Sequence, residues 1–157
     1  FLKLLHLSPN LIINFIDELE KNIPQRIEHT PMMTWQQIKE VENNNIYIAS
    51  HTHSHCNLSL IKDDTIIEEE LSKSKAIIKE KIGIDTDCIA FPNGMYNQNT
   101  INLAIKHGYK YLLAIDEKTN KKQNTNNIIY RQLIEHNSLL ENLFKIEGAY
   151  NILRKLK

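Results

Sequence analysis

The sequence is poor in cysteine, and it lacks both an excess of one charge and a long apolar run. Its 157 residues include only Cys56 and Cys88, which stand far apart and in no CxxC arrangement. Two cysteines cannot form the disulfide framework of a small secreted scaffold, so we expect free thiols unless the fold brings the two together. With 19 basic and 19 acidic side chains, the chain offers no electrostatic case for binding nucleic acid or an anionic membrane.

No apolar stretch approaches the length that spans a bilayer, and the chain opens without the pattern of a signal peptide. We therefore expect no transmembrane segment and, by default, a cytoplasmic location. The length fits a single domain over residues 1–157 with a real hydrophobic core. Because the first residue is Phe1 and not Met, the chain is either processed or a piece of a longer one. Nothing in the sequence indicates the oligomeric state.

Helices and strands are predicted to alternate along the chain. Apolar residues at helical spacing predict helices over residues 11–19, 35–42, 66–82, 100–107 and 138–156. Short apolar runs predict buried strands over residues 46–49, 88–91, 111–115 and 128–130. Such βα units build a parallel sheet or barrel, and a complete barrel needs roughly 250 residues. We therefore expect an α/β fold, an incomplete (β/α) barrel, with no internal repeat.

Several residues are predicted to begin or end these helices. Thr34 caps the helix at 35–42, and Asn99 or Thr100 caps the helix that ends near His107. Gly83 ends the helix at 66–82. One face of that helix is expected to be buried, and it consists of Ile67, Leu71, Ser74, Ile78 and Ile82.

Three histidines within five residues follow directly on the predicted strand at 46–49: His51, His53 and His55. Sites in parallel βα folds lie past the C-terminal ends of the strands. A turn of helix would put His51 and His55 on one face, whereas an extended chain would put all three on a common side. Either geometry gives a pair of imidazoles that can share one divalent ion. Segment 50–55 is therefore predicted to be a metal site, with a hydrogen-bonded polar loop as the alternative.

The number of candidate ligands favours an open site. A structural zinc site needs four protein ligands that leave no position open, and only Cys56 is near enough to add to the histidines. An open, catalytic-type site is therefore favoured over a structural one. Thr52 is expected to fix the loop through its hydroxyl.

Several motifs together resemble the family of polysaccharide deacetylases with a NodB-like domain, the carbohydrate esterase 4 type. The T-W pair at 34–35, the strand at 46–50 and the H-T-H-S-H run at 51–55 match the family's helix, strand and H-[ST]-x-x-H metal motif. The F-P-N-G-M-Y-N run at 91–97 is similar to its proline-aromatic-glycine turn. The resemblance covers about residues 34–131 and implies a (β/α) barrel of the NodB type.

The resemblance implies an enzyme, a metal-dependent carbohydrate deacetylase that removes N- or O-acetyl groups from a polysaccharide or glycan. His51 and His55 would hold a divalent metal, for which zinc is the default with histidine ligands. His53 falls at a variable position of the motif and is expected to be solvated or to act indirectly.

The resemblance also assigns roles around the turn at 92–96. Asn93 would donate its backbone N–H to the oxyanion, and Pro92, Gly94 and Tyr96 would contact the substrate. An ordinary Asn-Gly turn explains Asn93 and Gly94 as well, and a core or rim position would also suit Tyr96. Arg131 is the candidate partner of an active-site carboxylate.

Two further family features have poor counterparts. The arginine that often precedes the Pro turn is replaced by Ala90. For the late histidine that acts as general acid, His136 is the only candidate within reach, with a surface histidine as the alternative.

The family's first motif is missing. It is a strand ending in Asp-Asp, which supplies the base and the third metal ligand, and nothing before Thr34 resembles it. Asp63 and Asp64 stand at a helix start and are expected to serve there as caps. We therefore expect a truncated deacetylase with an incomplete site. The alternatives are a non-catalytic remnant or metal-binding module of the same fold, and an H-x-H type metal-dependent phosphoesterase or amidohydrolase.

Overall fold

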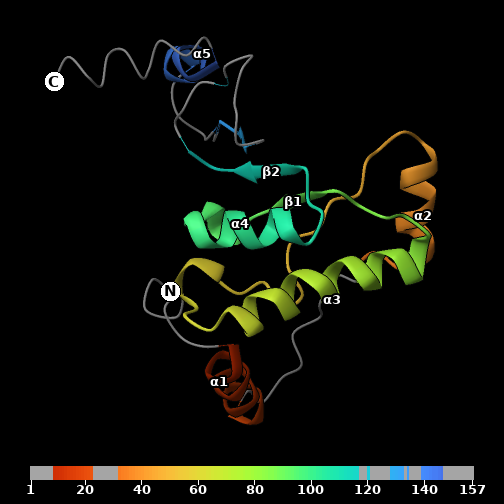
Figure 1. The fold of residues 1–157 in the computed structure, drawn as a ribbon, viewed down its shortest axis with the longest axis vertical. Helices are drawn as coiled ribbons and strands as arrows, with labels where there is room; N and C mark the ends of the chain where they lie inside the picture. Colours follow the sequence, from red (N-terminus) through yellow and green to blue (C-terminus); the bar gives the residue numbers. More distant parts are fainter. Residues whose placement is uncertain are drawn as a thin grey trace, which may run out of the picture.

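The structure, a computed structural model, describes residues 9–22, 32–116, 120, 128–132, 134 and 139–146 (Figure 1). The helices in these ranges are α1 (Pro9–Asn22), α2 (Trp35–Asn43), α3 (Asp64–Ile82), α4 (Gln98–Lys106) and α5 (Leu139–Ile146). The strands are β1 (Cys88–Ala90), β2 (Tyr111–Ala114) and β3 (Ile128–Tyr130), and the short 3₁₀ helices are η2 (Leu58–Leu60) and η3 (Pro92–Gly94). Of the helix expected over 138–156, residues 138 and 147–156 lie outside the described part.

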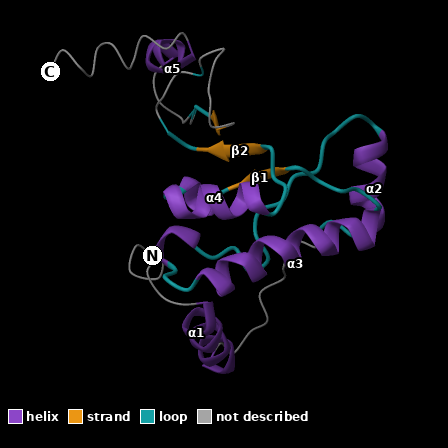
Figure 2. Cartoon of the chain, in the orientation of Figure 1, coloured by secondary structure: helices purple, strands orange, loops and turns teal. Residues whose placement is uncertain are grey.

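The sheet is parallel, with the strand order β1-β2-β3. Ile89 of β1 stands opposite Leu112 of β2, which in turn stands opposite Ile128 of β3. Helix α4 crosses from β1 to β2, as parallel pairing requires. In Figure 2, α4 and α3 lie on the same side of β1 and β2. The described part of the chain thus has the alternating βα order that was expected.

The predicted strand at 46–49 is wrong. Only the next residue, Ser50, pairs with the sheet, through an isolated parallel bridge to Ile89. The Ser50 N–H donates to Cys88 O at 2.9 Å, and Ser50 O accepts from the Ala90 N–H at 2.9 Å. Upstream of it, Tyr47 directs its hydroxyl to Asp87 Oδ1 at 2.7 Å. The apolar run therefore approaches β1, and the chain pairs with it only at the residue after the run.

Helix α3 forms where its sequence signals place it. Asp63 is the N-cap and accepts from the Thr65 N–H at 2.9 Å, while Gly83 ends the helix in the left-handed conformation. Hydrogen bonds from the Thr65 hydroxyl and N–H hold the pKa of Asp63 below its ordinary value. The predicted buried face is confirmed in full: Ile67, Leu71, Ser74, Ile78 and Ile82 are all buried.

The cap of α4 differs from the prediction. Asn97, and not Asn99 or Thr100, is the N-cap, and its Oδ1 accepts from the Thr100 N–H at 2.9 Å. Thr100 returns the contact, because its hydroxyl oxygen accepts from the Asn97 N–H at 3.0 Å. This reciprocal capping box begins the helix two residues earlier than its apolar spacing indicates. Thr34 forms a similar box with Gln37, so the predicted cap of α2 is confirmed.

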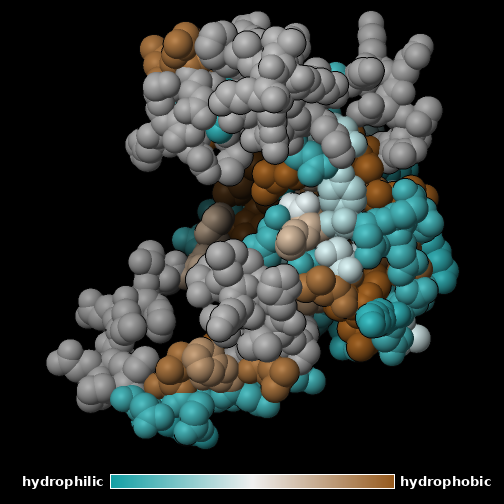
Figure 3. Space-filling view, turned by 90° about the vertical axis from the view of Figure 1, so that its left-hand side faces the viewer, coloured by the Kyte–Doolittle hydropathy of each residue, from teal (hydrophilic) through white to brown (hydrophobic). Residues whose placement is uncertain are grey.

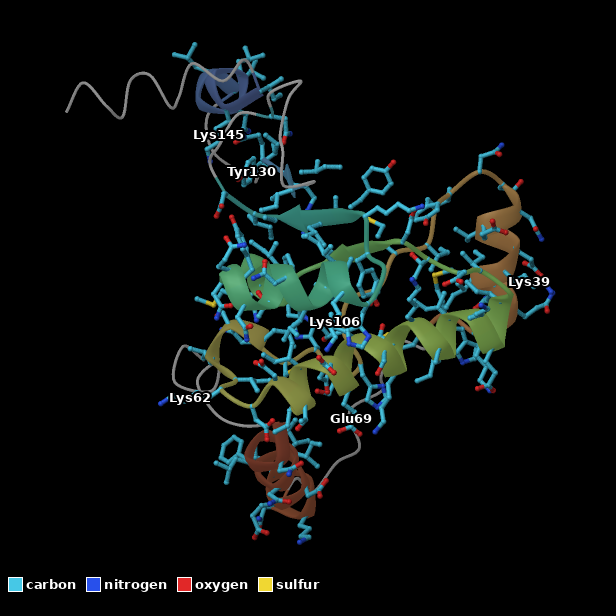
Figure 4. The ribbon with its side chains drawn as sticks, viewed as in Figure 1. Lys39, Lys62, Glu69, Lys106, Tyr130 and Lys145 are labelled. Atoms are coloured by element: carbon cyan, nitrogen blue, oxygen red, sulfur yellow. The ribbon has the colours of Figure 1, made fainter. Side chains whose placement is uncertain are left out.

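The hydrophobic core lies between the sheet and the two helices beside it. Ile67 and Leu71 of α3, Ile89 of β1 and Leu112 of β2 are fully buried, and burial of each stabilises the fold by about 1.5–3 kcal/mol. Tyr109 joins them and satisfies its hydroxyl by donating to Leu71 O at 3.0 Å. Outside the core, Lys106 of α4 reaches Glu68 of α3 at 2.5 Å between the two helices (Figure 4).

Helix α1 lies at the bottom of Figure 1 and exposes a row of apolar side chains. In Figure 3 a band of brown atoms lies just above a teal edge in the lowest part of the molecule. Its exposed apolar residues are Leu11, Ile13, Phe15, Ile16 and Leu19. Among the helices that the structure describes, none combines the length and the apolar content of a membrane span.

Candidate functional site

His51 lies immediately after the residue that pairs with β1, at the C-terminal end of the sheet. Its Nδ1 is 2.6 Å from the backbone oxygen of Ala90, the last residue of β1. A carbonyl oxygen only accepts, so Nδ1 carries the proton and Nε2 presents a lone pair. Histidine metal ligands are usually held in this way, with the second ring nitrogen donating to a carbonyl or carboxylate. The His51 ring therefore leaves Nε2 as the nitrogen that can bind a metal.

His55 lies next to His51, as the four-residue spacing predicts. The two ring centroids are 4.8 Å apart, and the ring planes meet at 69°. Thr52 and His55 both have a positive φ, 67° and 59°, which costs an L-residue roughly 1–2 kcal/mol each. Such backbone persists only where surrounding contacts over-determine it. The loop between the two histidines is therefore held in its shape by its neighbours.

The contacts that hold this loop come from α3. Glu70, only 8% exposed, accepts from the N–H groups of His53 and Ser54 at 2.9 and 2.8 Å. It also accepts from the Ser54 hydroxyl at 2.8 Å. One turn further along α3, the hydroxyl oxygens of Ser74 and Ser50 are 2.7 Å apart. Sequence reasoning missed Glu70, because a glutamate in an amphipathic helix is indistinguishable from its solvated neighbours until the loop is placed.

The expected role of Thr52 is wrong. Its hydroxyl is buried, and within the described residues it has no hydrogen-bond partner. The hydrogen bonds that fix the loop come instead from Glu70.

Cys56 follows His55 directly, but among the described residues it is not grouped with the two histidines closely enough to give a third ligand. Burial, and then the negative charge of Glu70, raise the pKa of its thiol from 9.0 to about 11. Both cysteines are free thiols, as expected.

The turn at Pro92–Gly94 lies at the end of β1, near the same edge of the sheet. Asn93 has φ 55° and ψ 14°, and Gly94 has φ 67°. Hydrogen bonds across the turn are donated by the Gly94 N–H to Phe91 O at 2.9 Å and by the Met95 N–H to Pro92 O at 3.1 Å. Neither bond uses the N–H of Asn93, which was predicted to face an oxyanion. The assignment of Asn93, Pro92 and Gly94 to the site stays a prediction.

Tyr96 lies just past this turn and is half-buried. Its ring stacks on Phe91 with 5.5 Å between the centroids, and its hydroxyl donates to Asp116 Oδ2 at 2.5 Å. Burial first, and then the carboxylate of Asp116, raise the pKa of the Tyr96 phenol well above its ordinary value. Asp116 lies two residues past the end of β2, directly after the predicted strand at 111–115, and was not singled out from the sequence. A polar residue one step past a buried strand was the available signal.

The remaining predicted residues of the site region are Arg131, His136 and His53. Arg131 is exposed and forms no ion pair with any residue that the structure describes, although its N–H donates to Ala114 O at 2.9 Å. His136 lies outside the described residues. The His53 side chain is exposed, while its backbone is held by Glu70. The roles assigned to Arg131 and His136 stay predictions.

A cavity of about 440 Å³ opens beside the histidine loop. His51, Thr52 and His53 form its polar part, and α2 and α3 supply apolar walls that include Trp35 and Ile77. Within the described ranges, no three histidine, cysteine, aspartate or glutamate side chains are grouped closely enough to hold a metal. The predicted ligands His51 and His55 therefore have no third candidate ligand beside them in these ranges, and their role as metal ligands stays a prediction.

Comparison with known proteins places this geometry in a family. Residues 17–112 match the profile of the family described as polysaccharide deacetylase. A protein of Bacillus subtilis (strain 168) named "Putative polysaccharide deacetylase YxkH" is 32% identical over 88 residues, which are 56% of this chain and 31% of that protein.

Two solved structures have a similar fold. One is the Streptococcus pyogenes deacetylase PplD in complex with acetate, with TM-score 0.65 and 25% identity over 75% of this chain and 52% of that one. The other is IcaB from Ammonifex degensii, with TM-score 0.66 and 20% identity over 82% of this chain and 57% of that one. The chain thus spans about half the length of these structures and a third of YxkH.

Because the family match covers more than half of the sequence, this chain belongs to the polysaccharide deacetylase family. This family consists of hydrolases of the carbohydrate esterase 4 type, whose NodB domain is a (β/α) barrel. The predicted family, enzyme class and fold class are confirmed. Deacetylases of this type generally depend on a metal, and an acetylated polysaccharide is the substrate that the family implies.

Proposed function

We propose that this chain provides the histidine pair and the oxyanion turn of a metal-dependent carbohydrate deacetylase, which acts on an acetylated polysaccharide or glycan. The observation that carries the proposal is the orientation of His51. Its Nδ1–H is committed to Ala90 O at 2.6 Å, and its ring lies 4.8 Å from that of His55. The backbone strain that accompanies this placement of two imidazoles favours a ligand site over a polar loop without a ligand.

In the proposed reaction, each group has a defined task. His51 and His55 hold the divalent metal, with zinc as the first candidate. When bound, such an ion polarises a carbonyl and lowers the pKa of water. The N–H of Asn93 is the candidate donor to the oxyanion, in a turn where Gly94 packs closely against Ile115, the residue after β2. Tyr96, tied to Asp116, forms the wall of the site next to this turn.

Completion of the site requires a carboxylate from outside the described residues. Two imidazoles alone bind a metal weakly and supply no base for the attacking water. We therefore propose that the site formed by the described residues binds a divalent ion weakly and supports little or no deacetylase activity unless another carboxylate joins it. A metal-binding module without catalysis is the second candidate, and the absence of a third ligand among the described residues favours it for the chain alone.

Zn²⁺ titration of the chain, in competition with a chromophoric chelator, tests the histidine pair. We expect His51→Ala and His55→Ala each to weaken Zn²⁺ binding at least tenfold. His53→Ala is the matched control, because His53 is exposed and belongs to the same loop. A loss in His53→Ala as large as that in His55→Ala would refute the proposed pair and would favour an H-x-H site.

Acetate release from N- and O-acetylated oligosaccharides tests the second part of the proposal. With Zn²⁺ present, we expect turnover by the chain at the level of a His51→Ala control. Robust turnover that disappears in His51→Ala would show that the described site is already complete. Restoration of turnover by a longer form of the protein would support the need for an additional carboxylate.

A further inference from the structure

Glu70 is a buried carboxylate that has no basic partner among the residues the structure describes. It is 8% exposed, and none of the salt bridges between described residues involves it. The two preceding residues of α3 behave differently, since Glu68 pairs with Lys106 and Glu69 with Lys73. Glu69 points away from the sheet (Figure 4). A charge this deep requires compensation, and Glu70 obtains it from hydrogen-bond donors of the histidine loop.

The donors are two successive backbone amides and one hydroxyl. Glu70 Oε2 accepts from the N–H groups of His53 and Ser54, and Oε1 accepts from the Ser54 hydroxyl. All three distances lie between 2.8 and 2.9 Å, in the range of good charge-assisted hydrogen bonds. The carboxylate therefore fixes the orientation of two consecutive peptide planes.

These two residues stand between the two strained positions of the loop. Thr52 precedes them with φ 67°, and His55 follows them with φ 59°. The peptide groups that Glu70 holds are therefore the ones that connect the left-handed turn at Thr52 to that at His55. Without them, the chain between the two histidines is free to relax both residues to ordinary backbone, and the His55 ring would leave the His51 ring.

A second contact from the same face of α3 fixes the other end of the segment. Ser74 is four residues after Glu70, one helical turn on, and its hydroxyl meets that of Ser50. Ser50 is itself hydrogen-bonded to β1 through both its backbone N–H and its backbone C=O. One end of the loop is thus tied to the sheet and α3, and its middle depends on Glu70.

We propose that Glu70 is a positioning residue of the metal site, which sets the placement of the His55 ring against the His51 ring through the backbone of residues 53 and 54. This inference rests on the proposed function only for the metal. The placement of the two rings is a property of the chain itself and can be measured without any ion.

The test compares Glu70→Gln with Glu69→Gln in the full chain. Both variants make the same chemical change at adjacent positions of α3, but only Glu70 accepts hydrogen bonds from the loop, whereas Glu69 pairs with Lys73. Glutamine offers one acceptor oxygen in place of two and brings an N–H₂ group against the donors of the loop. In Glu70→Gln we expect the nuclear Overhauser contact between the His51 and His55 rings to disappear and the amides of His53 and Ser54 to exchange at least tenfold faster. In Glu69→Gln we expect both readouts to stay as in the wild type.

Zn²⁺ affinity supplies the second readout. Loss of a group that orients a ligand typically weakens metal binding by about 10- to 100-fold, and we expect a loss in this range for Glu70→Gln. In a His51→Ala background, Glu70→Gln should cause no further loss, because the pair is already broken. Should Glu70→Gln fail to fold, Ser54→Ala removes one of the three hydrogen bonds at an exposed residue and is expected to weaken Zn²⁺ binding by a smaller factor.

The outcomes separate this inference from the proposed function. If Glu70→Gln keeps both the ring contact and the Zn²⁺ affinity of the wild type, the positioning role is refuted, and the histidine pair stands. If faster amide exchange leaves the ring contact and affinity unchanged, Glu70 only stabilises the loop, which also overturns the proposal. If the wild type binds no Zn²⁺ but Glu70→Gln loses the ring contact, Glu70 does position the rings, and the proposed function is wrong.

Discussion

Replacement of Gly94 by alanine tests how tightly the turn beside the site packs against Ile115, the residue that follows β2. A Cβ at Gly94 would lie 2.7 Å from the Cβ of Ile115 and 3.1 Å from its backbone nitrogen. The residue also has φ 67°, where an L-residue costs roughly 1–2 kcal/mol. Overpacking adds about 1–3 kcal/mol. We therefore expect Gly94→Ala to lower the free energy of unfolding by about 2–5 kcal/mol.

Gly83→Ala is the matched control for this prediction. Gly83 has φ 84° and no atom within 4 Å of the position of an added Cβ, so only the backbone cost of about 1–2 kcal/mol applies. The excess loss in Gly94→Ala therefore measures the contact with Ile115. Urea unfolding followed by circular dichroism gives both values by linear extrapolation.

Two further results test the contact between Gly94 and Ile115. The excess should fall when Ile115 is replaced by glycine in the Gly94→Ala background, since the nearest atom is then removed. Equal losses in Gly94→Ala and Gly83→Ala would show that the turn does not pack against Ile115 in solution, and the proposed oxyanion turn would lose its structural basis.

Two further predictions concern the cap of α4 and the tyrosine beside the turn. Asn97→Ala should lower the free energy of unfolding by about 1 kcal/mol, because the capping box is lost, whereas Asn99→Ala should cost less in the same urea titration. Because the pKa of Tyr96 is raised in the folded protein, the contribution of Tyr96 to stability is fully present below the pKa of the unfolded chain, near 10. This contribution is lost as the pH rises from there toward the pKa of the folded protein. Unfolding free energies measured from pH 8 to 11 should therefore decline above pH 10, and less steeply in Tyr96→Phe; equal slopes would contradict the buried contact with Asp116.

Much of the fold follows from local signals in the sequence. The buried face of α3, the cap at Thr34 and the end at Gly83 all depend on neighbours within a turn of helix, so periodicity and capping rules suffice for them. The spacing of His51 and His55 likewise predicted their proximity, because a compact turn brings residues four apart together.

The wrong strand prediction and the two missed carboxylates share a cause, which is that they depend on contacts between residues far apart in the sequence. Residues 46–49 have the composition of a strand, but a strand also needs a partner along its length, and only Ser50 meets β1. Glu70 and Asp116 gain their importance from residues far away in the sequence, in the loop after Ser50 and at Tyr96. No local pattern separates such carboxylates from solvated ones, so the supporting contacts of the site became visible only with the fold.

The parallel pairing of the three strands has a consequence for how the protein folds. Each pair in the described sheet joins segments separated by a long connection, and α4 occupies the one between β1 and β2. Closing such connections costs chain entropy before any strand contact is gained, which slows folding relative to helical domains of similar size. The histidine loop depends on β1 through Ser50 and Ala90. We therefore expect the two imidazoles to come together only once β1 is in place.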